Sequence, residues 1–256
     1  MDRSRRVEAL TLEFAKLYDA PPTDWFRAPG RVDLMGSHTD YNDGFVATMT
    51  VDRDTWIAIR PRTDRRVRIA TLNLPGSADF SLETIERDPA VPWTDYVRGA
   101  AQVLKDEGVQ IEGFDGLLHS TVPFGSGLSS SAAIESVVLL AFAAVSGVEI
   151  EPVRLALLGQ RVENEFVGLA CGILDQYTSV LGTAGHALLL DCRELTSEPV
   201  SIDEELAVVI CDTKAPRQLT GSEYDERRAQ REAGAALIAG YSPDVRALRD
   251  VPLELF

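Results

Sequence analysis

The chain has 256 residues, of which 45% are hydrophobic and 25% charged, so disordered, collagen-like and coiled-coil classes are excluded. Its 25 basic and 40 acidic side chains give a formal net charge of −15, which repels nucleic acids and anionic lipids, and we expect neither as a partner. The longest apolar stretch, residues 132–148, contains Glu135 and is shorter than the roughly 20 residues that a membrane helix needs. The charged amino-terminal residues lack the apolar core of a signal peptide, which predicts a cytoplasmic protein.

The first half of the chain alternates between predicted helix and predicted strand. Leu10, Phe14 and Leu17 recur at helical spacing before two prolines, so a helix is expected there. Three runs with the character of strands follow, at residues 25–34 (interrupted by Pro29-Gly30), 55–59 and 67–71. A helix is then predicted at 93–107 and a strand at 116–122.

The second half is richer in predicted helix. Apolar residues with a helical period predict two largely buried helices at 129–145 and 152–166. Short apolar runs at 187–190 and 206–211 have the length of strands, and the charged, alanine-rich residues 223–238 predict a last helix. This mixture predicts the α+β class.

Residues 122–133 place two glycines and three serines between a predicted strand and a long apolar helix. Gly125 and Gly127 let the backbone approach an anion, and the start of the following helix adds unpaired N–H groups and a positive dipole end. The serine hydroxyls can donate to phosphate or bind magnesium. An ordinary serine-capped helix after a tight turn is the alternative, but the full Pro-x-Gly-x-Gly-Leu-Ser-Ser-Ser string favours a phosphate-binding loop.

Other phosphate-binding motifs fit the chain less well. Lys16, Lys105 and Lys214 are the only lysines and none follows a glycine, which excludes a Walker A loop. A dinucleotide fingerprint would need a third glycine where Ser130 stands, although Glu149 lies at the spacing of a ribose contact, so an NAD-binding module is a weaker alternative. The chain has no Gly-x-Ser-x-Gly elbow, and the serines therefore give no support for a hydrolase triad.

These segments together resemble the GHMP small-molecule kinases, which are named for their galactose, homoserine, mevalonate and phosphomevalonate members. Residues 123–131 are similar to the second signature of this family. Residues 27–42, Arg-Ala-Pro-Gly-Arg-Val-Asp-Leu-Met-Gly-Ser-His-Thr-Asp-Tyr-Asn, are similar to the signature of its galactokinase branch. Further similarity is found in the same order at residues 163–168, 171–176 and 221–228. The resemblance implies a two-domain fold and phosphoryl transfer from ATP, with Mg²⁺, to a monosaccharide.

The resemblance also implies which residues carry the chemistry. The residues that would wrap the triphosphate are Gly125, Ser126, Gly127, Leu128, Ser129, Ser130 and Ser131. Ser131 and Glu163 would bind magnesium. Asp175 matches the catalytic aspartate that would accept or orient the proton of the anomeric hydroxyl, and Arg31 would steady the developing negative charge. Taken without the family, Glu163 would be an ordinary surface carboxylate and Asp175 an ordinary helix N-cap.

Sugar contacts are implied in the galactokinase signature and near the end of the chain, by Ser37, His38, Thr39, Asp40 and Tyr224. Asp40 is suited to accept hydrogen bonds from two adjacent hydroxyls of the sugar. Arg227 and Arg228, by contrast, are interpreted as part of a solvated helix face.

Two positions depart from the galactokinase pattern, which normally has glutamate at the position of Ser37 and asparagine at that of Asp33. In the resemblance the glutamate helps to hold the hydroxyl on the sixth carbon, so a serine would hold it less well. The expected reaction is galactose to galactose 1-phosphate. L-arabinose, which lacks the sixth carbon, is the alternative, because the Asp-x-Met-Gly run also resembles arabinokinases. Exchange of Ser37 for glutamate is then predicted to raise the preference for galactose.

Residues 1–195 are expected to form an amino-terminal GHMP domain with the sugar signature and the ATP loop, and residues 196–256 to begin a carboxy-terminal domain. GHMP kinases end with a glycine-rich third motif that is not found after Arg228, so we expect the second domain to be incomplete. A sensor that binds sugar and ATP without catalysis is the alternative to a working kinase. A monomer is expected.

Overall fold

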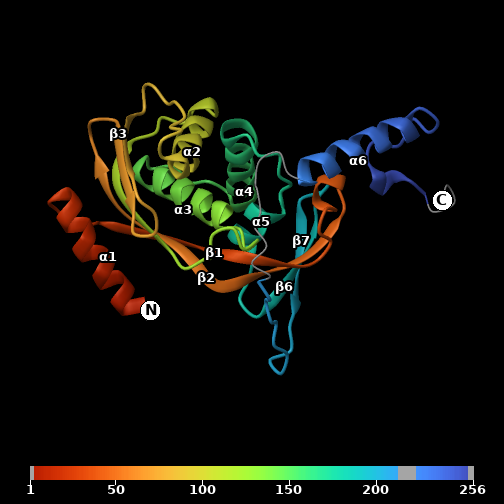
Figure 1. Ribbon diagram of the computed structural model, residues 1–256, viewed down its shortest axis with the longest axis horizontal. Helices are drawn as coiled ribbons and strands as arrows, with labels where there is room; N and C mark the ends of the chain where they lie inside the picture. Colours follow the sequence, from red (N-terminus) through yellow and green to blue (C-terminus); the bar gives the residue numbers. More distant parts are fainter. Residues whose placement is uncertain (1–2, 213–222, 253–256) are drawn as a thin grey trace.

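The computed structural model describes residues 3–212 and 223–252, in which seven strands form one sheet with helices on both faces (Figure 1). The strands are β1 (Asp24–Met35), β2 (Phe45–Arg62), β3 (Arg66–Thr71), β4 (Ser77–Ser81), β5 (Gly113–Ser120), β6 (His186–Asp191) and β7 (Thr196–Ser201). The α-helices are α1 (Arg3–Tyr18), α2 (Asp95–Asp106), α3 (Ser130–Val145), α4 (Pro152–Arg161), α5 (Leu174–Leu181) and α6 (Glu223–Ala239). Short helical turns are η1 (Asp40–Asn42), η2 (Pro92–Thr94), η3 (Val162–Val167) and η4 (Leu248–Asp250). The predicted α+β class is confirmed.

The long strand β2 organises the sheet. Its carboxy-terminal part pairs with β5 and its amino-terminal part with β6, in the order β4-β3-β5-β2-β6-β7, and β1 pairs along its other edge. All pairs are antiparallel except β3 with β5. The predicted interruption at Pro29-Gly30 is a register shift within a continuous β1, since proline cannot donate to the ladder. Beyond this shift β1 carries Arg31 into the site described below.

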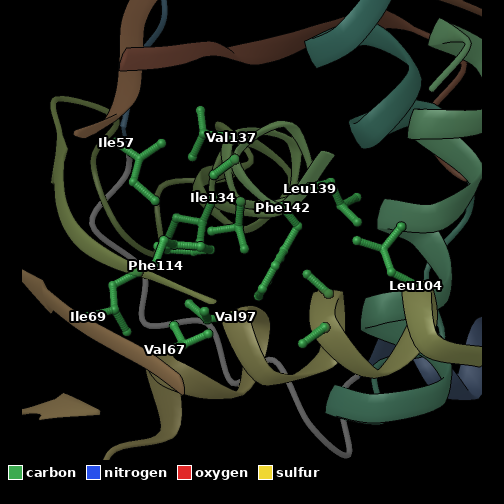
Figure 2. Packing of buried hydrophobic residues seen from close by; sticks show 14 of the residues in the cluster. Ile57, Val67, Ile69, Val97, Leu104, Phe114, Ile134, Val137, Leu139 and Phe142 are labelled. Atoms are coloured by element: carbon green, nitrogen blue, oxygen red, sulfur yellow. The ribbon is translucent and has the colours of Figure 1, made fainter. Parts of the chain in front are cut away.

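The main core lies between the sheet and helices α2, α3 and α4, which cover one face (Figure 1). Figure 2 shows its side chains, including Ile57 and Ile69 from the strands and Val97 and Leu104 from α2. Phe114 and Phe142 meet edge to face with ring centroids 4.9 Å apart. Helix α3 is apolar around most of its surface and buried along most of its length, so its amino-terminal end has a fixed position.

Helix α1 packs on the opposite face of the sheet. Leu10 and Phe14 are fully buried there against Trp56 and Leu117, as their helical spacing predicts. No helix in the described part of the chain is long and apolar enough to span a membrane.

The carboxy-terminal part departs from the sequence expectations at one segment. Residues 206–211, predicted as a strand, form none, and Leu206 and Val209 are 68% and 79% exposed. No strand within residues 3–212 and 223–252 pairs with this run, and apolar composition without a pairing partner does not make a strand. The expected domain boundary at residue 195 lies in the β6–β7 hairpin, so β7 continues the first sheet; the division into two domains stays a prediction.

Candidate active site

The loop before α3 contains three residues in the left-handed region of backbone conformation. Gly125 and Gly127 have φ of +68° and +77°, which side chains other than glycine rarely adopt. Ser129 also lies in the left-handed region, with φ +56°, immediately before α3 begins at Ser130. The first turn of α3 therefore leaves N–H groups free to meet an anion, while Leu128 is buried and anchors the loop.

Arg31 connects this loop to Asp175. Its backbone N–H donates to the carbonyl of Leu128 at 3.1 Å, and its guanidinium donates to the carbonyl of Gly127 at 2.7 Å and to Asp175 Oδ1 at 2.8 Å. The other oxygen of Asp175 accepts from the hydroxyl of Ser129. Residues from β1, the loop and α5, far apart in sequence, thus meet at one carboxylate.

These contacts overturn two plain structural interpretations. Asp175 lies in the first turn of α5, but the N-cap is Ile173 and the Asp175 carboxylate points to Arg31 and Ser129. The Ser129 side chain makes no capping bond to α3, because its hydroxyl is used on Asp175. The interpretation of the loop as a serine-capped helix is wrong for the same reason.

Glu163 lies in η3, a π-helical turn that continues α4, and is only 5% exposed. The expectation of a surface carboxylate, drawn from its residue type alone, is therefore wrong. The wider turn places its carboxylate toward the start of α3, where Ser131 donates a hydrogen bond to it. Burial raises the pKa of Glu163, and the nearby charge of Asp175 raises it further.

Two fully buried polar residues, Gln176 and Glu135, form a hydrogen-bonded chain that ends at the Glu163 carboxylate. The side-chain amide nitrogen of Gln176 donates to Glu163 Oε2 and to Glu135 Oε2, both at 3.0 Å. Glu135 Oε1 and Gln176 Oε1 are buried without a partner among the described residues. Burial, and next the charge of Glu163, raises the pKa of Glu135 well above its usual value. Sequence reasoning missed this pair, although Glu135 was the one acidic residue in the longest apolar stretch.

The residues expected to bind Mg²⁺ fit that ion. In the described residues no group of three or more His, Cys, Asp and Glu side chains is arranged to hold a metal by itself. A carboxylate and a hydroxyl, Glu163 and Ser131, are the kind of partial oxygen site that Mg²⁺ completes with phosphates and water.

The sugar signature forms a tight turn between β1 and β2. The Thr39 hydroxyl lies 2.7 Å from both the Gly36 and the Phe45 carbonyl oxygens and ties the turn together. Ser37 is exposed and donates to Asp33, and His38 Nδ1 lies 2.6 Å from the Tyr41 hydroxyl. The hydroxyl of Thr39 thus shapes the turn, and direct contacts of the three residues 37–39 with a sugar stay a prediction.

Asp40 follows this turn and approaches the start of α5. A side chain at Gly172 would meet Asp40 Oδ2 at 1.8 Å, so only glycine permits this approach. Burial raises the pKa of Asp40, and the charge of Asp175 adds to the rise. A hollow of about 390 Å³ lies beside Asp40 and is lined by residues that include Gln160, Cys171, Gly172, Arg228 and Arg231.

Helix α6 lies against the sugar turn. Arg231 donates to the Asn42 side chain at 2.9 Å, and Arg228 lines the hollow next to Asp40. Arg228 also pairs with Glu232 along α6 at 3.2 Å and is 32% exposed, so its interpretation as part of a solvated helix face stays a prediction, whereas Arg227 is exposed as expected. The side chain of Tyr224 lies outside the described residues.

A second, smaller hollow adjoins the phosphate-binding loop, and sequence reasoning did not find it. It is lined mainly by apolar and aromatic side chains that include Leu74, Trp93, Phe124 and Ile134. Phe124 directly precedes Gly125 of the loop, and the hollow, of about 10 Å³, has room for no more than a water molecule.

Two family models match this chain, one over the sugar turn and one over the segment that contains the loop, Glu163 and Asp175. The galactokinase galactose-binding signature matches residues 12–61, and the GHMP kinase N-terminal domain matches residues 95–183. Galactokinase of Chloroflexus aurantiacus is 44% identical over 245 residues, which are 96% of this chain and 63% of the relative. Galactokinase of Roseiflexus sp. is 46% identical over 238 residues, which are 93% of this chain and 61% of the relative.

The solved structure of Lactococcus lactis galactokinase complexed with galactose superposes with a TM-score of 0.88 at 32% identity, covering 98% of this chain and 66% of that one. The chain belongs to the galactokinase branch of the GHMP kinase family. The range that matches the galactose-binding signature contains Arg31 and Asp40. The range that matches the GHMP domain contains the loop, Glu163 and Asp175. The chain spans less than two thirds of the length of these galactokinases.

Proposed function

We propose that the protein transfers the γ-phosphoryl group of ATP to the anomeric hydroxyl of galactose, forming galactose 1-phosphate and ADP. The observation that carries this proposal is the position of Asp175, which shares contacts with Arg31 and the loop on one side and lies near Asp40 on the other. Phosphoryl transfer depends mostly on positioning and charge neutralisation, and this arrangement offers both.

In the proposed reaction Asp175 accepts or orients the proton of the sugar hydroxyl. The hydroxyl oxygen forms a bond to the γ-phosphorus, the bond from that phosphorus to the bridging oxygen breaks, and ADP leaves with the electron pair. Arg31 lies between Asp175 and the loop, where its guanidinium offsets negative charge that develops on the transferred group. Loop N–H groups at the start of α3 hold the phosphates.

Ser131 and Glu163 would hold Mg²⁺, which neutralises phosphate charge when it is bound. Gln176 and Glu135 keep the Glu163 carboxylate directed at that position. The cytoplasmic location and the monomeric state stay predictions.

The proposed function is tested by mixing the protein with MgATP and, in turn, galactose, L-arabinose, N-acetylgalactosamine and mevalonate, and by measuring ADP release. We expect release with galactose above that with any other acceptor. Faster release with L-arabinose would replace the substrate but keep the reaction. Sugar and ATP binding without release would support the sensor and contradict the kinase.

A further inference from the structure

Two arginine–aspartate pairs join the end of strand β6 to the short helical turn η4. Arg249 of η4 donates to both carboxylate oxygens of Asp191, the last residue of β6, at 2.5 and 2.8 Å. Arg193, in the turn that follows β6, donates to Asp250 at 2.6 Å. The other oxygen of Asp250 accepts from the backbone N–H groups of residues 246 and 247, both at 2.9 Å. Each segment thus contributes one arginine and one aspartate, and these four residues are called the ion-pair cluster below.

The ion-pair cluster is packed more tightly than an ordinary surface ion pair, which contributes little to a fold. Its four side chains are between 15% and 32% exposed. The Arg249 guanidinium lies over the ring of Phe45, 4.3 Å from the ring centroid. Hydrogen bonds from Arg249 lower the pKa of Asp191, and those from Arg193 lower the pKa of Asp250, so both carboxylates are charged at neutral pH. The two-bond contact with Asp191 therefore fixes the orientation of the Arg249 guanidinium.

Arg249 also contacts the turn that carries Asp40. Its Nη1 donates to the carbonyl oxygen of Asp43 at 2.6 Å, and the N–H of Asp43 donates to the carbonyl oxygen of Asp40 at 3.2 Å. Asp43 has a φ of +59°, a left-handed conformation that is unfavourable for a residue other than glycine. The Arg193 guanidinium lies 3.5 Å from the carboxylate of the same residue. A contact from η4 therefore supports the backbone conformation that places Asp40.

We propose that Arg249 is a positioning residue for sugar recognition, which holds the sugar turn (residues 36–44) against the end of β6 and thereby sets the position of the Asp40 carboxylate. This inference rests on the proposed function, since it takes Asp40 as a sugar contact. Asp40, Asp43 and Arg193 line the same hollow, so a shift of the turn would change the shape of the hollow beside Asp40. Lysine cannot replace Arg249 fully, because an ammonium group lacks the planar fork that binds a carboxylate and a carbonyl together.

Hydrogen–deuterium exchange of the sugar-free protein tests whether Arg249 holds the turn. We expect Arg249→Ala to raise the exchange rate of the backbone amides in residues 36–44 on the order of tenfold, because hydrogen bonds to a charged group are lost there. The amides of α3 should exchange as in the parent. Arg246→Ala removes an exposed arginine of the same segment and is the matched control.

Circular dichroism checks the fold of each variant. Arg249→Lys keeps the charge and should show a smaller increase in the same residues, and it provides the test if Arg249→Ala does not fold. Unchanged exchange of residues 36–44 in the folded variants would overturn the inference, whether or not the protein is a kinase.

Steady-state kinetics separate positioning of the sugar turn from a general loss of stability. Arg249→Ala should raise the KM for galactose on the order of tenfold, because a displaced Asp40 meets the sugar less well. The KM for ATP and kcat should change less than about threefold, since Arg31 and Asp175 are held by other contacts. Arg249→Lys should recover part of the loss. Equal increases of the two KM values would contradict a positioning role.

Titration calorimetry with galactose alone shows whether Arg249 acts through Asp40. In an Asp40→Asn background, adding Arg249→Ala should weaken galactose binding by less than about twofold, because the group that Arg249 positions is already impaired. A further tenfold loss in that background would overturn the inference. Weaker galactose binding by Arg249→Ala supports it even if the parent releases no ADP and the proposed reaction fails. Undiminished galactose affinity in Arg249→Ala, with turnover by the parent, would refute the role of Arg249 and leave the reaction intact.

Discussion

At the scale of single residues, the proposed reaction depends most on Asp175, which is the proposed proton acceptor. Asp175→Asn keeps the size of the side chain but removes the proton acceptor, so kcat should fall on the order of 10²- to 10⁴-fold. Galactose affinity, measured by calorimetry, should change less than about threefold, because Asp40 and its neighbours remain. Exchange of the exposed Asp203 for asparagine is the control. Undiminished turnover by Asp175→Asn would remove the catalytic assignment.

We expect Glu135 to make the stability of the protein depend on pH. Because burial raises its pKa, the native state keeps this proton to a higher pH than the unfolded chain, and stability falls as pH rises above about 4.5 toward the raised pKa. Glu135→Gln removes this contribution. As pH rises across that range, the free energy of unfolding of Glu135→Gln should therefore increase relative to that of the parent, by up to about 1.4 kcal/mol per pH unit.

Urea unfolding of parent and Glu135→Gln between pH 4.5 and 8 measures this difference, with the exposed Glu204→Gln as control. A constant difference between parent and Glu135→Gln over the whole range would show that Glu135 does not retain its proton in the native state.

At the scale of elements, the approach of the sugar turn to the start of α5 depends on Gly172. A Cβ there would overlap the Asp40 carboxylate, so Gly172→Ala should displace Asp40 and raise the KM for the sugar at least about tenfold. Gly234→Ala, in open space on α6, should leave KM unchanged. An unchanged KM in Gly172→Ala, measured by steady-state kinetics, would show that Asp40 does not contact the sugar.

The elements themselves were largely predictable from periodicity, and their relative placement was not. The spacing of Leu10 and Phe14 and the apolar residues of α3 gave the right helices, because local pattern and burial agree there. The π-helical turn at η3 and the missing strand at 206–211 were not predictable, since both depend on what the rest of the chain places beside them. The partnership of Ser37 with Asp33 required the structure for the same reason.

At the scale of the whole molecule, helix α1 stabilises the sheet from the face opposite the site. Phe14 is fully buried against this face, so Phe14→Ala should lower the free energy of unfolding by about 3–5 kcal/mol. At temperatures where the variant is folded, kcat for galactose should stay within about twofold of the parent, because no residue of α1 lies in the site. Thermal unfolding and ADP release measure the two effects, and a large loss of kcat in the folded variant would contradict this separation.

The central claim is that the groups gathered around Asp175 transfer phosphate to the anomeric oxygen of galactose. Phosphorus NMR of the protein with MgATP and galactose tests it most directly. We predict one new phosphate-ester signal, split by the anomeric hydrogen, that grows in step with ADP and does not appear with Asp175→Asn. ADP formation that is independent of galactose, or a phosphate ester on another sugar carbon, would contradict the account.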